Sequence, residues 1–266
     1  MALIEDIYEV PKSCLVDYVV PKKAIFEAAD SNTSEKRVFT DLIKRIKWCY
    51  KFTEDNLRIT PYLDDVRNYI EVEVITIELK YDNVHKIGAG KFKEDSEIDD
   101  IARTVMRFIP YPIILTTQYE NELKFYGAHI RESKSDSEKI VIDDKILSTN
   151  WMDIDDLSEI EEDFISKIQL DNLDKTDFYD FYDDYITAII QHDGAIAVGG
   201  TVDLPVDEIE KINAQISTLE RKIREIEKEI DEETNFNARM DLNIKAHGLK
   251  IEIEKLKNKL KGEEYG

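Results

Sequence analysis

Cysteine, glycine and long apolar runs are all scarce in this 266-residue chain. The two cysteines, Cys14 and Cys49, cannot form a disulfide framework, so the sequence predicts a reducing, cytoplasmic location. No apolar run approaches the roughly 20 residues that span a bilayer, so no membrane segment is expected. The first ten residues carry three acids and no base, which is not typical of a secretory signal.

Basic residues are in the minority, with 36 Lys and Arg against 58 Asp and Glu, and the formal net charge is −22. The apolar share of 42% still excludes wholesale disorder, which requires low hydrophobicity together with high charge. The length allows one or two domains with a hydrophobic core.

The negative charge is concentrated in residues 151–210, which contain 18 Asp or Glu and only two bases, Lys167 and Lys175. One interpretation is a surface that mimics nucleic-acid phosphate and occupies a basic groove on a partner. The other is the solvated side of amphipathic helices, because apolar residues recur at helical spacing within 178–190. We favour the second interpretation, in which these acids lie on the solvated sides of amphipathic helices.

The N-terminal half alternates between helix and strand patterns. We expect helices at 34–51 and 97–108, and strands at 69–80, 112–119 and 122–130, the last two joined as a hairpin at Glu120 and Asn121. Residues 131–150 are expected to be a polar connection into a short strand, followed by helices near 155–169 and 177–191. This order predicts the α+β class, with a small mixed sheet, helices packed on one of its faces, and a domain that spans 1–193.

Three of the nine glycines cluster in 194–206, which we expect to be a Gly-rich linker. Past the linker, one heptad seam contains Ile209, Ile212, Ile216, Leu219, Ile223, Ile226 and Ile230. A second phase collects Leu242, Ala246, Leu249, Ile253, Leu256 and Leu260. The two phases predict a break near 231–237 and an antiparallel helical hairpin (a coiled coil) over 207–262.

Three apolar residues of the second helix, Met240, Ile244 and Ile251, lie outside its seam. They suggest that a further helix, from a partner or from a second copy, completes the bundle. The alternative is that they pack on the α+β domain of the same chain.

Most catalytic motifs fail on inspection. The segment GAGK at 88–91 is not a phosphate loop, since His85 and Phe92 replace residues that the motif requires, and no cysteines or histidines have zinc spacing. Asp65, followed by Glu78 and Lys80 at the end of the 69–80 strand, has the order found in metal-dependent nucleases. There, carboxylates hold a divalent cation and the lysine steadies the attacking water. An ion pair at a strand end explains Glu78 and Lys80 equally well.

Several short motifs occur together along the chain: Pro11-Lys12-Ser13, Pro21-Lys22-Lys23, Glu78-Leu79-Lys80, Ile109-Pro110-Tyr111, Thr149-x-Trp151 and Phe236-Asn237-x-Arg239-Met240-Asp241-Leu242-Asn243. In this combination the chain resembles an uncharacterised prokaryotic family of domains of unknown function, numbered 4391. The resemblance implies a gene setting near helicases and DNA methyltransferases, of the restriction or phage-defence kind. Asn235, Ala238 and Asp241 stand where that family usually shows Gln, Arg and Glu.

We therefore expect a non-enzymatic accessory or adaptor protein that docks a protein partner, a helicase or a DNA methyltransferase, through the hairpin. The expected contact residues at its tip are Phe236, Asn237, Arg239, Asn243 and Lys245, since an aromatic residue near an arginine is typical of interface hot spots.

Several alternatives stay open. Phe236 plugs the turn while its polar neighbours cap helix ends, or the hairpin dimerises the chain, or the protein is the nuclease or the acidic mimic described above. No cofactor is expected, and a divalent metal only for the nuclease. Whether nucleic acid binds is open.

Overall fold

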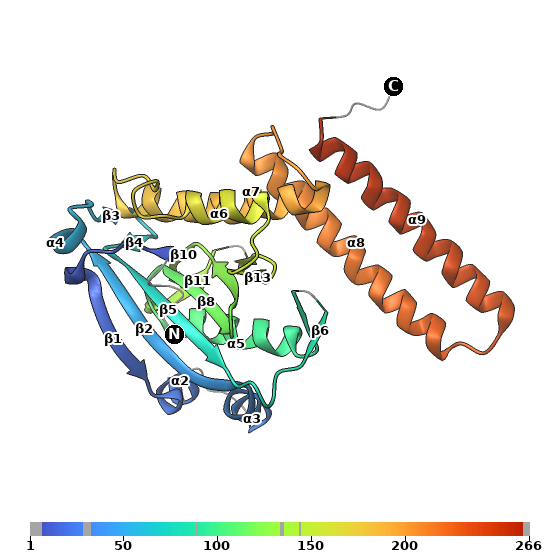
Figure 1. The fold of residues 1–266 in the computed structure, drawn as a ribbon, viewed down its shortest axis with the longest axis horizontal. Coiled ribbons are helices and arrows are strands. Elements are labelled where there is room, and N and C mark those ends of the chain that lie inside the picture. Colours follow the sequence, from blue (N-terminus) through green and yellow to red (C-terminus); the bar gives the residue numbers. More distant parts are fainter. Residues whose placement is uncertain (1–6, 29–32, 89, 134–135, 144, 263–266) are drawn as a thin grey trace. The chain divides into compact units, whose positions relative to one another are not determined.

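This computed structural model describes residues 7–28, 33–88, 90–133, 136–143 and 145–262 (Figure 1). The chain divides into two compact units, Met1–Ile189 and Ile190–Gly266. No helix in these described ranges combines the length and the apolar character needed to cross a lipid bilayer.

A mixed, seven-stranded sheet forms the centre of the first unit. Its order is β1-β2-β5-β8-β9-β12, and β13 also pairs with β9. The strands are β1 (Leu15–Val20), β2 (Ile43–Thr53), β5 (Glu71–Leu79), β8 (Ile113–Tyr119), β9 (Glu122–Gly127), β12 (Leu147–Ser148) and β13 (Met152–Asp153). Among the described strands of this sheet, only β5 and β8 pair in parallel, and the helix α5 (Asp95–Phe108) supplies the crossover that a parallel pair requires. The expected strands at 69–80, 112–119 and 122–130 and the helix at 97–108 are confirmed.

The described part of the first unit also contains three small hairpins. They are β3 (Tyr62–Leu63) with β4 (Asn68–Tyr69), β6 (Lys86–Gly88) with β7 (Lys91–Phe92), and β10 (Ile130–Ser133) with β11 (Asp136–Ile142). The last of them lies in 131–150, where the sequence predicts a polar connection into a short strand; the structure has two paired strands there. Among the described residues, the unit also contains the helices η1 (Lys12–Cys14), α2 (Lys22–Ala28), α3 (Thr33–Leu42), α4 (Glu54–Leu57), α6 (Glu159–Lys167) and the start of α7 (Phe178–Val198).

Helices cover both faces of the sheet, not one as expected. On one face, α2, α3 and α5 bury side chains against Ile75 and Leu115 in a shared apolar core. On the other, the rings of Phe125 and Phe164 lie 5.3 Å apart, and those of Phe52 and Phe181 lie 5.8 Å apart. These contacts place α6 and α7 against the second face, so the unit has three layers (Figure 1). The predicted class, a mixed sheet with packed helices and a C-terminal hairpin, is confirmed.

The helix expected at 34–51 is wrong beyond Leu42, where the chain becomes strand β2. The reason is irregular pairing: the β2–β5 register shifts between Ile43 and Arg45 and again between Trp48 and Tyr50. Each shift breaks the two-residue alternation of a strand, so buried residues recur at intervals of three and four, as they do in a helix.

The linker expected at 194–206 is also partly wrong, because α7 continues to Val198. Gly194 is buried within the helix, and a Cβ there would lie 2.7 Å from Cγ2 of Ile209. This glycine therefore allows close packing between α7 and the next helix and does not provide flexibility. The two compact units divide between Ile189 and Ile190, a few residues before the predicted boundary at 193.

The C-terminal hairpin consists of α8 (Val206–Glu232) and α9 (Phe236–Leu260). Every residue of both predicted seams is buried or half-buried, and the turn falls within the predicted break at 231–237. Asn235 caps α9, since its side-chain oxygen accepts hydrogen bonds from the backbone N–H groups of Asn237 (2.9 Å) and Ala238 (3.2 Å). The hairpin itself is therefore confirmed.

Candidate functional site

The structure does not bring Asp65 together with Glu78 and Lys80. Asp65 lies between β3 and β4, before β5 begins, whereas Glu78 and Lys80 lie at the far end of β5. The seven residue-to-residue steps of strand from Glu71 to Glu78 span ~23 Å at about 3.3 Å per step.

Glu78 and Lys80 instead have structural partners. Nε of Arg45 donates to Oε1 of Glu78 at 2.6 Å, and Nζ of Lys44 lies 3.6 Å from its other oxygen. Nζ of Lys80 donates to the carbonyl oxygen of Thr40 at 2.7 Å. Glu78 therefore forms ion pairs at the strand end, as the alternative predicts, but its partners are Arg45 and Lys44, and Lys80 binds a backbone carbonyl. Across the described residues, no group of three His, Cys, Asp or Glu side chains is arranged to hold a metal ion.

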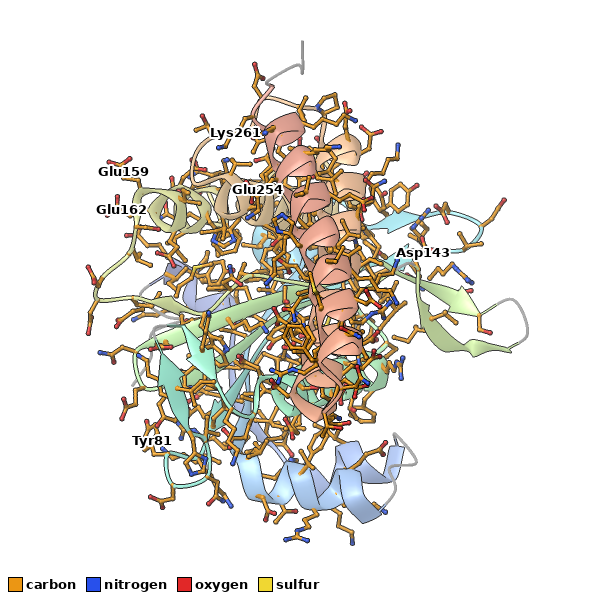
Figure 2. The ribbon with its side chains drawn as sticks, turned by 90° about the vertical axis from the view of Figure 1, so that its right-hand side faces the viewer. Tyr81, Asp143, Glu159, Glu162, Glu254 and Lys261 are labelled. Carbon is orange, nitrogen blue, oxygen red and sulfur yellow. The ribbon has the colours of Figure 1, made fainter. Side chains whose placement is uncertain are left out.

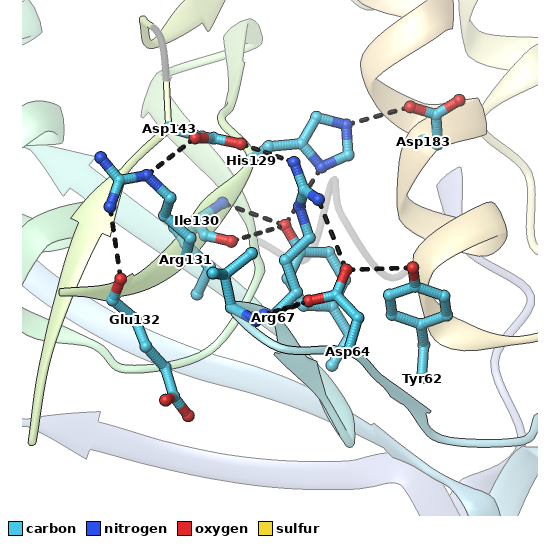
Figure 3. Close-up of polar contacts among 11 residues, drawn as sticks. Tyr62, Asp64, Arg67, His129, Ile130, Arg131, Glu132, Asp143 and Asp183 are labelled. Atoms are coloured by element: carbon cyan, nitrogen blue, oxygen red, sulfur yellow. Dashed lines mark hydrogen bonds and ion pairs between the residues drawn. The ribbon is translucent and has the colours of Figure 1, made fainter. Parts of the chain in front are cut away.

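A polar network in the first unit connects the β3–β4 hairpin to β10 and to the end of β11 (Figure 3). Asp143 bridges two guanidinium groups, with Nη2 of Arg67 at 2.6 Å and Nε of Arg131 at 2.9 Å. Asp64 accepts hydrogen bonds from the N–H groups of Val66 (2.8 Å) and Arg67 (2.6 Å). The Val66 hydrogen bond is the main reason why the pKa of Asp64 lies below its usual value. The network fixes the conformation of this hairpin.

The same network contains an Asp-His-Tyr series. Nε2 of His129 lies 3.0 Å from Oδ1 of Asp183, and Nδ1 lies 3.1 Å from the hydroxyl oxygen of Tyr69 (Figure 3). Tyr69 is fully buried, which raises the pKa of its hydroxyl, and both backbone groups of Ile130 bond to that hydroxyl. The series joins α7 to the buried Tyr69 and to β10, so we assign it a structural role.

Glu73, on β5, is a buried carboxyl with a raised pKa. It is 1% exposed, and burial, together with the neighbouring Glu71, raises its pKa to about 8. Glu71 pairs with Lys51, whose Nζ lies 2.6 Å from Oε2. Since the protein encloses Glu73, we expect this carboxyl to affect stability and not catalysis.

The acids of 151–210 do not form one separate face within the first unit. On α7 they alternate with buried aromatic residues, and Asp183 and Asp184 are themselves half-buried. Asp183 contacts His129, and Asp184 accepts a hydrogen bond from the N–H of Asp174 at 2.7 Å. Glu159 and Glu162 extend into solvent from the start of α6 (Figure 2). This arrangement is that of ordinary amphipathic helices.

In the second unit, α9 has two apolar faces on opposite sides. One packs on α8. The other, which we call the outward face, consists of Phe236, Met240, Ile244 and Ile251, which are 78%, 55%, 61% and 46% exposed. At about 100° per residue, the centre of this set lies roughly 180° from the seam. By contrast, each Ile, Leu and Val of α8 is buried or half-buried.

The five predicted contact residues are distributed around this face. Phe236 begins α9 and belongs to the outward face, and its exposure means that it does not plug the turn. Arg239 and Asn243 follow one edge, Asn237 the other, and Lys245 lies further round toward the seam. The side-chain amide of Asn243 donates to the carbonyl oxygen of Arg239 at 2.7 Å, so Asn243 is bound to its own helix.

These features define a class of protein: a three-layer domain with a mixed sheet, and an antiparallel helical hairpin with an exposed apolar face. A family model described as Domain of unknown function (DUF4391) matches residues 9–261, and the chain belongs to this family, as the resemblance predicted. A comparison with curated proteins found no match, and neither did a comparison with solved structures.

Proposed function

We propose that this protein is a non-enzymatic accessory or adaptor protein that binds a protein partner through the outward face of α9. The observation that supports the proposal is the exposure of four large apolar side chains, spaced i, i+4, i+8 and i+15, on one side of a single helix. Removing such surface from water contributes about 25 cal/mol per Å². Exposed aromatic and aliphatic residues that cluster in this way are typical of interaction sites.

The identity of the partner rests on the family resemblance alone. The gene setting that it implies favours a helicase or a DNA methyltransferase of a restriction or defence system. We propose one of these two as the partner.

The nuclease alternative has less support, because about 23 Å of strand separates the beginning of β5 from Glu78 and Asp65 precedes that beginning. Magnesium- or manganese-dependent cleavage of DNA that the Glu78→Ala variant loses would contradict our proposal.

The test is affinity purification of the full-length protein from the cells that produce it. Met240→Ser with Ile244→Ser removes the centre of the outward face without touching the seam. Arg221→Ser with Glu225→Ser, also four residues apart and exposed on α8, is the matched control. We expect the control to retain the partner and the α9 variant to lose it, with both showing wild-type circular dichroism. Capture of the same proteins by both variants would refute the proposal.

A further inference from the structure

The charge of α9 is opposite in sign to that of the chain. Between Phe236 and Leu260 there are six Lys or Arg and three Asp or Glu, whereas the whole chain carries −22. At about 100° per residue, one row along the helix contains only cations and an amide. This cationic edge, which borders the outward face, consists of Arg239, Asn243, Lys250, Lys257 and Lys261. Figure 2 shows Lys261 at the end of α9 and Glu254, which lies outside the row.

Three of the four cations of this edge are well exposed. Arg239 and Lys261 are exposed, and Lys250 pairs with Glu227 of α8 at 2.9 Å but is still 57% exposed. Lys257 is 31% exposed and lies 3.9 Å from Glu254 of its own helix. A partner with carboxylates beside its apolar surface would therefore find cations in reach along the same edge.

The outward face has the dimensions of a helix–helix contact. From Phe236 to Ile251 there are 15 residue-to-residue steps, or ~22 Å at about 1.5 Å per step. It is a narrow ridge of single side chains, one per turn for most of its length. Such a ridge is matched by another helix that lies along it and contributes residues at i, i+3, i+4 and i+7.

A second copy of the chain is a poor occupant on grounds of charge. In a two-fold antiparallel pair, the cationic edge of one α9 faces the cationic edge of the other. This arrangement brings like charges together.

Nucleic acid and lipid are also poorer occupants. Phosphate backbones require cations at the centre of the contact, where α9 presents Phe236, Met240 and Ile244. Helices that lie in a membrane surface have a fully polar second side, whereas the second side of α9 is buried against α8.

From this combination we infer that the outward face of α9 binds an amphipathic helix of the partner, whose apolar stripe carries Asp or Glu along one side. The inference rests on the proposed function and specifies the chemistry of the partner segment.

The experiment places a photo-crosslinking amino acid, p-benzoylphenylalanine, at position 244 of the full-length protein in the cells that produce it. Mass spectrometry then identifies the attached peptide. The same group at position 225, on the far side of α8, is the control. We expect position 244, and not 225, to attach to a helix-forming segment with an apolar stripe and an excess of Asp and Glu beside it.

Charge-reversal variants provide a second test in the same crosslinking experiment. Arg239→Glu with Lys257→Glu should lower the crosslink yield roughly tenfold, since like charges then meet across the contact. Lys222→Glu with Arg224→Glu on α8, which changes the net charge equally, should leave the yield unchanged.

Each outcome separates the two proposals. Attachment to a protein segment that is basic, or not helical, overturns the inference and leaves the proposed function standing. Attachment to a second copy, to nucleic acid or to lipid, or no attachment at all, overturns both.

Discussion

Substitution of one glycine tests the packing of α7 on the sheet. Gly127 ends strand β9, and a Cβ added there would lie 2.7 Å from Cδ1 of Ile186, 2.9 Å from Cε1 of Tyr185 and 3.3 Å from Cδ1 of Ile189. All three side chains belong to α7 and are buried. The first two distances are shorter than any real contact of a Cβ, so Gly127→Ala forces the helix or its side chains to move.

The loss of stability in Gly127→Ala depends on how far these three side chains can move. Tyr185 is held by a hydrogen bond of 3.0 Å from its hydroxyl to the carbonyl oxygen of Tyr126, so its ring cannot turn away freely. Overpacking of a well-packed core costs about 1–3 kcal/mol. Alanine also stabilises a strand relative to glycine, by roughly 0.5–1 kcal/mol, through the unfolded state. We expect the overpacking to exceed this gain and the free energy of unfolding to fall by about 1–2 kcal/mol.

Gly248→Ala is the matched control, since the same substitution in α9 meets nothing within 4 Å and Gly248 lies inside the helix. It should raise helix stability by about 1 kcal/mol. Urea titration followed by tryptophan fluorescence reports the first unit, because Trp48 and Trp151 both belong to it, and circular dichroism reports α9. If Gly127→Ala unfolds at the same urea concentration as wild type or higher, α7 does not approach β9 as described.

Three further predictions concern stability. Leu219→Asp places a carboxylate in the α8–α9 seam and should lower the free energy of unfolding by roughly 3 kcal/mol or more. The control Ser217→Asp, at an exposed position of α8, should not have this effect. Equal melting curves for the two variants by circular dichroism would show that the seam register is wrong. The raised pKa of Glu73 means that the folded state holds a proton between pH 4.5 and about 8 that the unfolded state releases, so stability should fall by up to about 1.4 kcal/mol per pH unit as pH rises through this window. Glu73→Gln should remove that slope in urea titrations at pH 5 to 8, while Glu9→Gln on the surface keeps it, and parallel slopes for all three proteins would contradict the assignment. Asn235→Ala removes the cap of α9 and should cost about 1 kcal/mol in thermal melts, an expectation that an unchanged melting temperature contradicts.

The elements that the sequence predicts correctly are those whose pattern is set locally. Strand β5 is a run of β-branched residues, α5 keeps its apolar residues on one side, and the α8 seam repeats without interruption. Strand β2 is the exception, because its two register shifts exist only in relation to β5. The packing of α6 and α7 on the second face of the sheet was not predicted for a similar reason, since the sequence of a helix does not determine which face of a distant sheet it covers.

The candidate site was predictable in part. The heptad pattern identifies the seam residues of α9, and Met240, Ile244 and Ile251 are apolar residues outside that seam. Apolar residues that the seam does not use indicate the outward face. The network around His129 and Asp183 gave no such signal. Its members come from segments about 50 residues apart, and their polar side chains look like surface residues until the fold brings them together.

The late position of α6 and α7 has a consequence for biosynthesis. The sheet strands up to Gly127 leave the ribosome before these helices, and the first unit is complete only at Ile189, about 60 residues later. At 5–20 residues per second, the interval is roughly 3–12 s. During that time Val72, Val74 and Phe125, which end up fully buried, have no covering layer, and the nascent chain presents an apolar strand surface to chaperones and to neighbouring chains.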